Sequence, residues 1–322
     1  MELKDKFLGT VLGCAVGDAL GAPFEACKGS VIKSVENLMS GYQQIANYPL
    51  GQYTDDTQLT LVLAETYIAN HRFKAVDFAN RLAELWAKGE IIGPGLSCTD
   101  AVRNLQSGKK WTESGAGQGR AGNGAAMRAS PVGLWNYDNL EQLKKDAIAQ
   151  SHITHQDTRA KAGAVAVASA VAYNLRHQAI DPEELSESVS ELVKDVDREF
   201  SEHLARLPDW LKKDEQVAVL EISCAGWLTP PRWIDQITPF VIPTVLIGLY
   251  NFLRSPDNFT LTVQRTLEAG GDVDTTSAIA GAISGAFNGK NAIPERLLEE
   301  LYQRDLIENT ALRLYQAGHA DF

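Results

Sequence analysis

Cysteine and histidine are scarce in this sequence. Its 322 residues include 4 cysteines and 6 histidines, and the cysteines, at positions 14, 27, 98 and 224, are widely separated. Structural zinc sites need clustered Cys and His ligands, often as CxxC pairs, and no such pair is present. We therefore interpret the cysteines as buried thiols and expect a protein of the reducing cytoplasm.

Positive charge is also in short supply. Lys and Arg number 30 against 41 Asp and Glu, which gives a formal net charge of −11. A general nucleic-acid binder needs clustered basic residues to neutralise phosphates, so the composition argues against this class. A small phosphate-bearing ligand remains compatible with the composition if metal ions and backbone N–H groups supply the positive field.

Alternating apolar and polar residues, the pattern of half-buried strands, are nearly absent. Apolar residues instead recur every three or four positions, as at Phe7, Val11 and Leu12, and hydrophobic residues make up 44% of the chain. The pattern predicts an all-α protein, a compact globule of many orthogonally packed helices. The composition does not break along the chain, so we expect a single domain over residues 1–322, and a monomer.

The apolar opening of the chain, MELKDKFLGTVLGCAVGDAL, is interrupted by Asp5 and Asp18. It therefore predicts a buried first helix, with no signal peptide, membrane span or membrane partner. Further helices are expected at 57–71, 74–88, 97–106, 160–173, 183–207, 215–224 and 239–253, with two more within 294–316. The segment 30–53 predicts a long loop that forms a lid or a wall of a site.

Carboxylates gather at the start of two helices. In LEAGGDVDTTSAIAGAISGAFNG (267–289), Asp272 and Asp274 follow a Gly-Gly turn and precede Thr275 and Thr276. A helix N-terminus needs one short oxygen-bearing side chain, and the additional negative charge is unfavourable without a cation.

The stretch QYTDDTQLTLVLAE (52–65) repeats this arrangement with Thr54, Asp55, Asp56 and Thr57. Hard oxygen ligands of this kind suit Mg²⁺ or Mn²⁺, whereas Zn²⁺ favours His and Cys. One such cluster would be explained equally well as a heavily decorated helix cap. Two clusters favour a metal site.

Three other features are ambiguous by themselves. Glu25 lies in a loop, where a glutamate is usually solvated surface. The glycine-rich run KKWTESGAGQGRAGNG (109–124) is either a flexible linker or a loop whose N–H groups bind phosphate. His152 and His155 are three residues apart, a spacing more typical of polar packing than of metal binding.

Five motifs occur in a fixed order over nearly the whole chain: GCAVGDALGAPFE (13–25), YTDDTQ (53–58), GNGAAMRASPVG (122–133), THQDTRA (154–160) and GGDVDTTSAIAGA (270–282). Together they resemble the ADP-ribosylglycohydrolase family, which includes the dinitrogenase-reductase-activating glycohydrolase and the J-type crystallins. The resemblance implies an all-helical fold with a cleft that holds two Mg²⁺ or Mn²⁺ ions. It also implies hydrolysis of the bond between C1″ of an ADP-ribose and its acceptor.

The resemblance assigns roles to single residues. The residues that match metal ligands are Thr54, Asp55, Asp56, Asp272, Asp274 and Thr275, with Asp274 shared by the two ions. Those that match substrate-binding residues are Gly122, Asn123 and Gly124 around the diphosphate and His155 on the ribose and phosphate side. Glu25 is placed near the centre, on a loop that can close over substrate. Val273 stands where family members often carry Thr, outside the expected ligands.

The implied reaction passes through an oxocarbenium-like state that water attacks from one face. Metal ions would orient the ribose and polarise that water, and Glu25, Asp55 and Asp56 are all candidates to guide its proton. The expected substrate is an ADP-ribosylated protein, linked through arginine or oxygen, or an ADP-ribose-containing small molecule. Arginine-specific relatives carry an acidic residue in the loop after the third helix, but the matching stretch 91–99 has none. Glu90 and Asp100 flank it.

Two other classes stay open. The first is a non-catalytic, crystallin-like structural or binding protein. The complete metal motifs argue against this class. The second is a different di-metal enzyme, a nucleotide pyrophosphohydrolase. Such enzymes gather acids along helices in ExxE spacings, whereas here the acids sit at the starts of helices.

Overall fold

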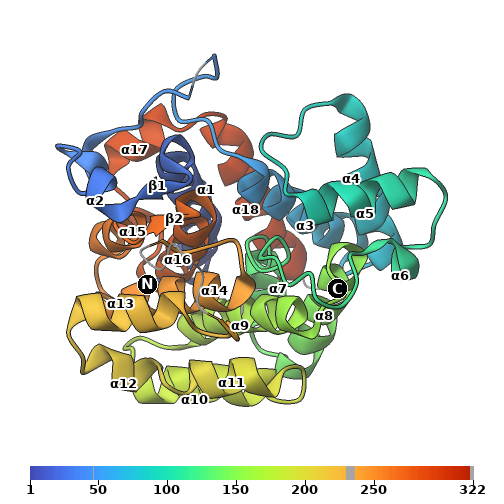
Figure 1. Ribbon diagram of the computed structural model, residues 1–322. Coiled ribbons are helices and arrows are strands. Elements are labelled where there is room, and N and C mark those ends of the chain that lie inside the picture. The colour runs from blue at the N-terminus through green and yellow to red at the C-terminus, as the bar shows by residue number, and fades with distance from the viewer. Residues whose placement is uncertain (46, 230–235, 320–322) are drawn as a thin grey trace.

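The computed structural model describes residues 1–45, 47–229 and 236–319, and these residues form helices almost throughout (Figure 1). The elements of the first half are α1 (Leu3–Gly21), η1 (Ala22–Phe24), β1 (Cys27–Lys28), α2 (Gly29–Ile32), η2 (Leu38–Ser40), α3 (Asp55–Asn70), α4 (Ala75–Lys88), α5 (Leu96–Gln106), α6 (Trp111–Ser114), α7 (Ser130–Trp135), α8 (Leu140–Thr154) and α9 (Thr158–Arg176). Those of the second half are α10 (Pro182–Val193), α11 (Arg198–Leu204), α12 (Leu207–Leu211), α13 (Glu215–Ser223), α14 (Val241–Arg254), α15 (Phe259–Leu267), β2 (Gly270–Gly271), α16 (Val273–Asn288), η3 (Lys290–Ala292), α17 (Glu295–Glu300) and α18 (Arg304–Gly318). The predicted all-α class is confirmed.

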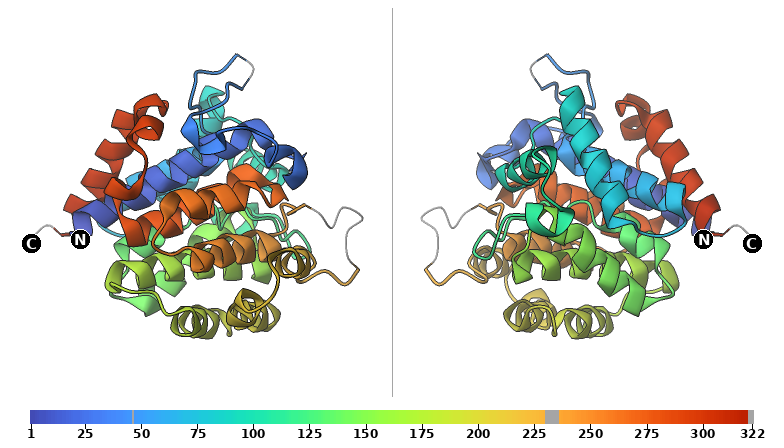
Figure 2. Two further views of the ribbon diagram at one scale, coloured as in Figure 1. Left: turned by 90° about the vertical axis from the view of Figure 1, so that its left-hand side faces the viewer. Right: turned by 90° about the vertical axis from the view of Figure 1, so that its right-hand side faces the viewer.

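The helix α16 is at the centre of the molecule. It contacts α1, α9, α14 and α15, and every described side chain from Val273 to Phe287 is buried. The views of Figure 2 show α1 and α16 running side by side, with α10, α11 and α12 as an outer layer on the far side of α9 and α14. The small side chains of α16 allow this crowding, because close approach of helices needs small residues at the contact.

Glycines on α1 set how closely it approaches α16. They recur at every fourth position and so lie along one face of the helix, at Gly9, Gly13, Gly17 and Gly21. A Cβ added at Gly17 would lie 2.0 Å from the carbonyl oxygen of Ser277, and one added at Gly13 would lie 2.3 Å from that of Gly281. Any side chain here would therefore separate the two backbones.

The segment Leu3–Phe24 is long and apolar enough to cross a membrane, but 83% of its most apolar window is buried inside the molecule. Burial of this kind is typical of the core helix of a packed domain. It agrees with the predicted buried first helix.

A two-stranded clasp joins the end of this first segment to the start of α16. The strand β1 pairs antiparallel with β2, with Cys27 opposite Gly271 and Lys28 opposite Gly270. The pairing holds the backbone after Glu25 against the backbone before Asp272. Two motifs about 250 residues apart in the sequence are thereby brought to one place.

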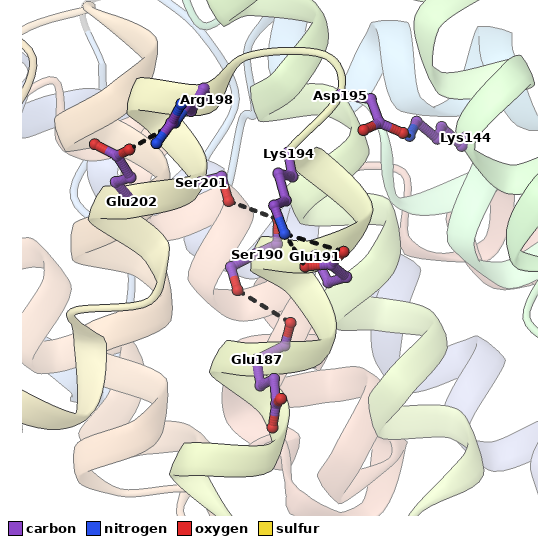
Figure 3. A network of polar contacts seen from close by, with 9 residues as sticks. All are labelled: Lys144, Glu187, Ser190, Glu191, Lys194, Asp195, Arg198, Ser201 and Glu202. Carbon is purple, nitrogen blue, oxygen red and sulfur yellow. Dashed lines mark hydrogen bonds and ion pairs between the residues drawn. The ribbon is translucent and has the colours of Figure 1, made fainter.

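The prediction of one continuous helix over 183–207 is wrong. The chain forms two helices there, α10 and α11, separated by a turn at residues 194–197. Asp197 starts the second helix as an N-cap, its side chain accepting a hydrogen bond from the N–H of Phe200. The hydroxyl of Ser201 donates to the carbonyl of Ser190 at 2.8 Å and ties the two helices together (Figure 3). Lys144 of α8 reaches Asp195 in the turn at 3.1 Å. Charge periodicity alone did not reveal this cap.

We predict that Gly17→Ala destabilises the protein by about 3 kcal/mol or prevents folding, because the new methyl group meets backbone that cannot move aside. Gly117→Ala is the matched control, since a Cβ at that loop position meets nothing within 4 Å. The free energy of unfolding, measured by urea denaturation, should change by less than about 0.5 kcal/mol in this control. Equal stabilities for the two variants would contradict the packing argument.

A candidate metal centre at the floor of a cleft

Most of the candidate site residues line one cleft of about 830 Å³. Its carboxylates are Glu25, Asp55, Asp56, Asp272 and Asp274, and its lining also includes Gly122, Asn123, Gly124, His155 and Thr275. Of the candidates, only Thr54 is not part of the lining. The helix starts of α3 and α16 and the glycine-rich loop, far apart in the sequence, therefore meet at one cavity.

Neither acidic cluster caps its own helix. Thr54 precedes α3 and Asp272 precedes α16, yet neither side chain accepts a capping hydrogen bond from a backbone N–H of its helix. The hydroxyl of Thr54 instead donates to Asp18 at 2.9 Å. The interpretation of these clusters as decorated helix caps is thus wrong, and their carboxylates need another explanation.

Asp18 of α1 caps α3 from outside that helix. Its fully buried carboxylate accepts hydrogen bonds from the N–H of Thr54 and the N–H of Thr57, both at 3.0 Å, and from the hydroxyl of Thr57 at 2.6 Å. These contacts fix the segment that carries Asp55 and Asp56. Sequence reasoning noted Asp18 only as an interruption of an apolar run. A carboxylate in the buried stripe of a helix was the signal that marked it.

The second cluster is held by the glycine-rich loop and by the first cluster. The side-chain amide of Asn123 donates to Asp272 at 2.5 Å and to the hydroxyl of Thr244 at 3.1 Å. The hydroxyl of Thr275 donates to Asp56 at 3.4 Å. The two helix starts are therefore in direct contact across the floor of the cleft.

Two carboxylate oxygens on this floor lack a partner. Oδ1 of Asp56 and Oδ1 of Asp274 are buried and accept no hydrogen bond from the described residues. Burial raises the pKa of Asp55, Asp56 and Asp274 well above the usual range, and repulsion from neighbouring carboxylates adds to the effect. Unpartnered, mutually repelling carboxylate oxygens are groups that a hard divalent cation would satisfy, so the donor set fits Mg²⁺ or Mn²⁺.

Glu25 reaches the same centre from the outside. Its residue is exposed, and its carboxylate, with those of Asp272 and Asp274, offers oxygens that all lie within 4.8 Å of one another. The next residue, Ala26, has a left-handed backbone with φ of 63°, which is unfavourable for a residue with a Cβ. Its N–H donates to the carbonyl of Gly271 at 2.8 Å. The clasp between β1 and β2 thus fixes where Glu25 stands.

The glycine-rich run is an anchored loop. The N–H of Asn123 donates to Pro239 at 3.1 Å, and Ala121 accepts from the N–H of Val241 at 3.0 Å. The N–H groups of Gly122 and Gly124 make no hydrogen bond to the described residues. The linker interpretation is therefore wrong, and the loop offers two free donors to the cleft.

The two histidines differ. His155 is buried in the cleft wall, with Nδ1 2.9 Å from the hydroxyl of Thr154. Burial above all, helped by Arg128 and Arg120, lowers the pKa of His155 to about 3, so the ring is neutral at ordinary pH. His152 does not line the cleft and places a ring nitrogen 3.1 Å from the carbonyl of Thr112. It fits the polar-packing interpretation.

The loop at 91–99 forms part of the cleft wall through Gly93, Gly95, Leu96, Ser97 and Cys98, but it brings no carboxylate. Glu90 and Asp100 do not line the cleft, and Asp100 pairs with Arg120 at 3.0 Å. None of the described residues of the segment 30–53 lines the cleft either. The expected lid or wall is therefore not formed by that segment, whose Ile32 and Leu38 pack into the core.

Comparisons with known proteins agree with this geometry. The family model named ADP-ribosylglycohydrolase matches residues 1–321. The chain belongs to this family. The ADP-ribosyl-(dinitrogen reductase) glycohydrolase of Rhodospirillum rubrum is 28% identical, over 93% of this chain and 91% of its own. The ADP-ribosylarginine hydrolase Tri1 of Serratia proteamaculans is 29% identical, over 100% of this chain and 82% of its own.

A solved structure described as an ADP-ribosylglycohydrolase-related protein complex superposes with a TM-score of 0.75 at 27% identity. It covers 98% of this chain, and 99% of that structure's chain is matched. At the level of the family, the comparisons support hydrolysis of ADP-ribosyl bonds by this ADP-ribosylglycohydrolase family member.

A pH dependence follows from Asp18. Burial raises the pKa of its carboxyl from 3.8 to about 6, so the folded protein holds this proton more tightly than the unfolded chain does. The resulting stability is complete below pH 3.8 and is lost as the pH rises through about 6. In chelator, the wild type should therefore lose stability relative to Asp18→Asn over this window, by a few kcal/mol at most.

Urea denaturation at several pH values measures this difference. Asp209→Asn, at a position where the side chain is 73% exposed, is measured alongside as the control for an Asp→Asn exchange outside the cluster. If the stability difference between the wild type and Asp18→Asn stays constant over this pH window, burial does not raise the pKa of Asp18.

Proposed function

We propose that this protein is an ADP-ribosyl hydrolase that cleaves the C1″ glycosidic bond of ADP-ribose attached to a protein side chain or a small acceptor, using two Mg²⁺ or Mn²⁺ ions. One observation supports it above the others. Buried carboxylate oxygens of Asp56 and Asp274, from two different helices at the floor of a cleft, have no hydrogen-bond partner among the described residues. A protein without a cation there would gain nothing from keeping these charges.

The residues divide into two groups along the cleft. The ions would be held by Asp55, Asp56, Asp272, Asp274 and Thr275, which line the cleft, and by Thr54, which does not. When bound, the ions supply positive charge and Lewis-acid polarisation. The free N–H groups of Gly122 and Gly124, with neutral His155 beside them, would receive the diphosphate and ribose. A net negative protein can in this way bind a negatively charged ligand, because the local donors and ions outweigh the distant charge.

The reaction needs a water molecule whose proton is removed as it attacks C1″. In that step a C1″–O bond forms, the bond from C1″ to the acceptor breaks, and the acceptor leaves with a proton. Glu25 is suited to take the water's proton, since its exposed carboxylate lies beside Asp272 and Asp274 without being buried among them. Asp55 and Asp56 remain the alternative bases.

The function is tested by incubating the protein and Mg²⁺ with arginine-linked and serine-linked ADP-ribosyl peptides. Release of free ADP-ribose supports the proposal, whereas AMP would indicate a pyrophosphohydrolase and no product a structural protein. The cleft wall at 93–98 carries no carboxylate to pair with a guanidinium. We therefore propose that the acceptor is not restricted to arginine, and a strong arginine preference would contradict this part.

For the metal ions, we predict that Asp274→Asn keeps the fold but loses most affinity for Mg²⁺, together with activity, because one of the buried carboxylate charges that would hold the ions is removed. Isothermal calorimetry measures the number of ions bound, expected to be two in the wild type. Asp146→Asn is the matched control, since Asp146 is also buried but lies with Tyr67 and Asn136 outside the cleft. Normal binding of two ions by Asp274→Asn would exclude Asp274 as the shared ligand.

For Glu25, we predict that Glu25→Gln binds Mg²⁺ and ADP-ribose almost as the wild type does but turns over at least about 100-fold more slowly, because the amide cannot accept the water's proton. Single-turnover assays and calorimetry on the same preparation separate the two effects. An unchanged rate would move the role to Asp55 or Asp56. A parallel loss of Mg²⁺ binding would instead make Glu25 a metal ligand.

A further inference from the structure

Arg128 is a buried cation without an anionic partner. Its side chain is fully buried, and among the ion pairs of the described residues none involves it. Its guanidinium donates to the carbonyl of Gly124 at 2.8 Å, to the side chain of Gln150 at 2.8 Å and to the hydroxyl of Thr154 at 2.7 Å. All the hydrogen bonds of this buried charge go to neutral groups, while the Asp55 carboxylate attracts it without a direct contact. This arrangement indicates that Arg128 holds its acceptors in fixed positions.

The hydrogen bonds around Thr154 have a definite direction. A guanidinium can only donate, so Oγ1 of Thr154 accepts from Arg128. The same oxygen lies 2.9 Å from Nδ1 of His155. Arg128 engages one of the two lone pairs of this oxygen and leaves the hydroxyl hydrogen free to be donated, and Nδ1 is the strong acceptor within reach. In a neutral imidazole, a nitrogen that accepts leaves the proton on the other nitrogen, here Nε2.

One competing arrangement exists. The sulfur of Cys98 is also within reach of the Thr154 hydroxyl, and a hydroxyl that donated to sulfur would leave Nδ1 to carry the proton. Sulfur is the weaker acceptor, and this one already lies 3.7 Å from the guanidinium of Arg128. The imidazole nitrogen is therefore the preferred acceptor.

Nε2 of His155 lies close to the two glycines of the glycine-rich loop. It has no hydrogen-bond partner among the described residues, and His155 lines the cleft. A Cβ at Gly122 would lie 3.3 Å from Nε2, and one at Gly124 would lie 2.9 Å from the neighbouring Cε1. The two glycines thus leave this ring edge uncovered, beside their own free N–H groups.

We propose that Arg128 and Thr154 are positioning residues that fix His155 as the neutral Nε2–H tautomer, which makes it a hydrogen-bond donor to an oxygen of the ligand in the cleft. Together with the N–H groups of Gly122 and Gly124, it completes a set of uncharged donors on one wall. The identity of the ligand, an ADP-ribosyl group, rests on the proposed function. The tautomer does not.

The tautomer is read from two-bond ¹H–¹⁵N spectra of the folded protein, with the His155 signals assigned by their loss in His155→Gln. We expect Nε2–H in the wild type, in Thr154→Ser, which keeps the hydroxyl, and in Cys98→Ala. Thr154→Val removes the donor at nearly constant shape and should release the fixed tautomer. An Nδ1–H ring in the wild type, or an unchanged ring in folded Thr154→Val, would overturn the proposal. If Thr154→Val does not fold, the wild-type spectrum still decides.

Calorimetry with ADP-ribose adds the functional consequence. Thr154→Val should bind ADP-ribose about tenfold more weakly, the effect of one misdirected hydrogen bond, whereas Thr154→Ser should stay within about threefold. Both should bind Mg²⁺ as the wild type does, because Thr154 is not among the candidate metal ligands. Equal ADP-ribose affinity in Thr154→Val would overturn the positioning role. A wild type that does not bind ADP-ribose would overturn the proposed function and leave the spectra to judge the tautomer.

Discussion

The backbone contact between α1 and α16 is the constraint on which the rest of the structure depends. Glycines at every fourth position of α1 let the two helices approach until main chain meets main chain. At one end of this contact, a Cβ on Gly21 would lie 2.5 Å from the Cα of Asp274. The close approach therefore brings Asp18 and Glu25 to the helix start that carries Asp272 and Asp274. A wider spacing would separate the carboxylates by the width of a side chain.

The floor of the cleft gathers buried carboxylates whose negative charges repel one another. Five aspartates at positions 18, 55, 56, 272 and 274 are buried together, and burial raises the pKa of each. The protein satisfies Asp18 and Asp272 with hydrogen bonds from Thr57 and Asn123. One oxygen each of Asp56 and Asp274 has no hydrogen-bond partner in the part of the chain that the structure describes. The carboxylates that accept hydrogen bonds thus hold the framework, while the oxygens without partners are the groups that the proposed cation would satisfy.

Sequence patterns located many of the helices and most of the residues that line the cleft, but they missed α8 and α15 and the contacts that join the helices. Periodicity located α3, α4 and α5 to within two residues, because their apolar stripes face the core. It did not separate α10 from α11, since the break depends on Asp197 acting as a cap in an evenly charged stretch. Asp18 was visible only as a misplaced charge. Its partners Thr54 and Thr57 lie on another helix, and tertiary contacts of this kind leave no local pattern.

The glycine-rich loop shows why the same residues can support several interpretations until they are seen in three dimensions. As letters, GNG indicates flexibility, and the free N–H groups of Gly122 and Gly124 would be found in many loops. In the structure, Asn123 between them is fixed at both its backbone and its side chain, so the two glycines are held in place. Because neither glycine has a side chain, the edge of the His155 ring next to them is not covered. Glycine here leaves room for the ring of His155, and the hydrogen bonds of Asn123 anchor a run that its composition alone would assign to a linker.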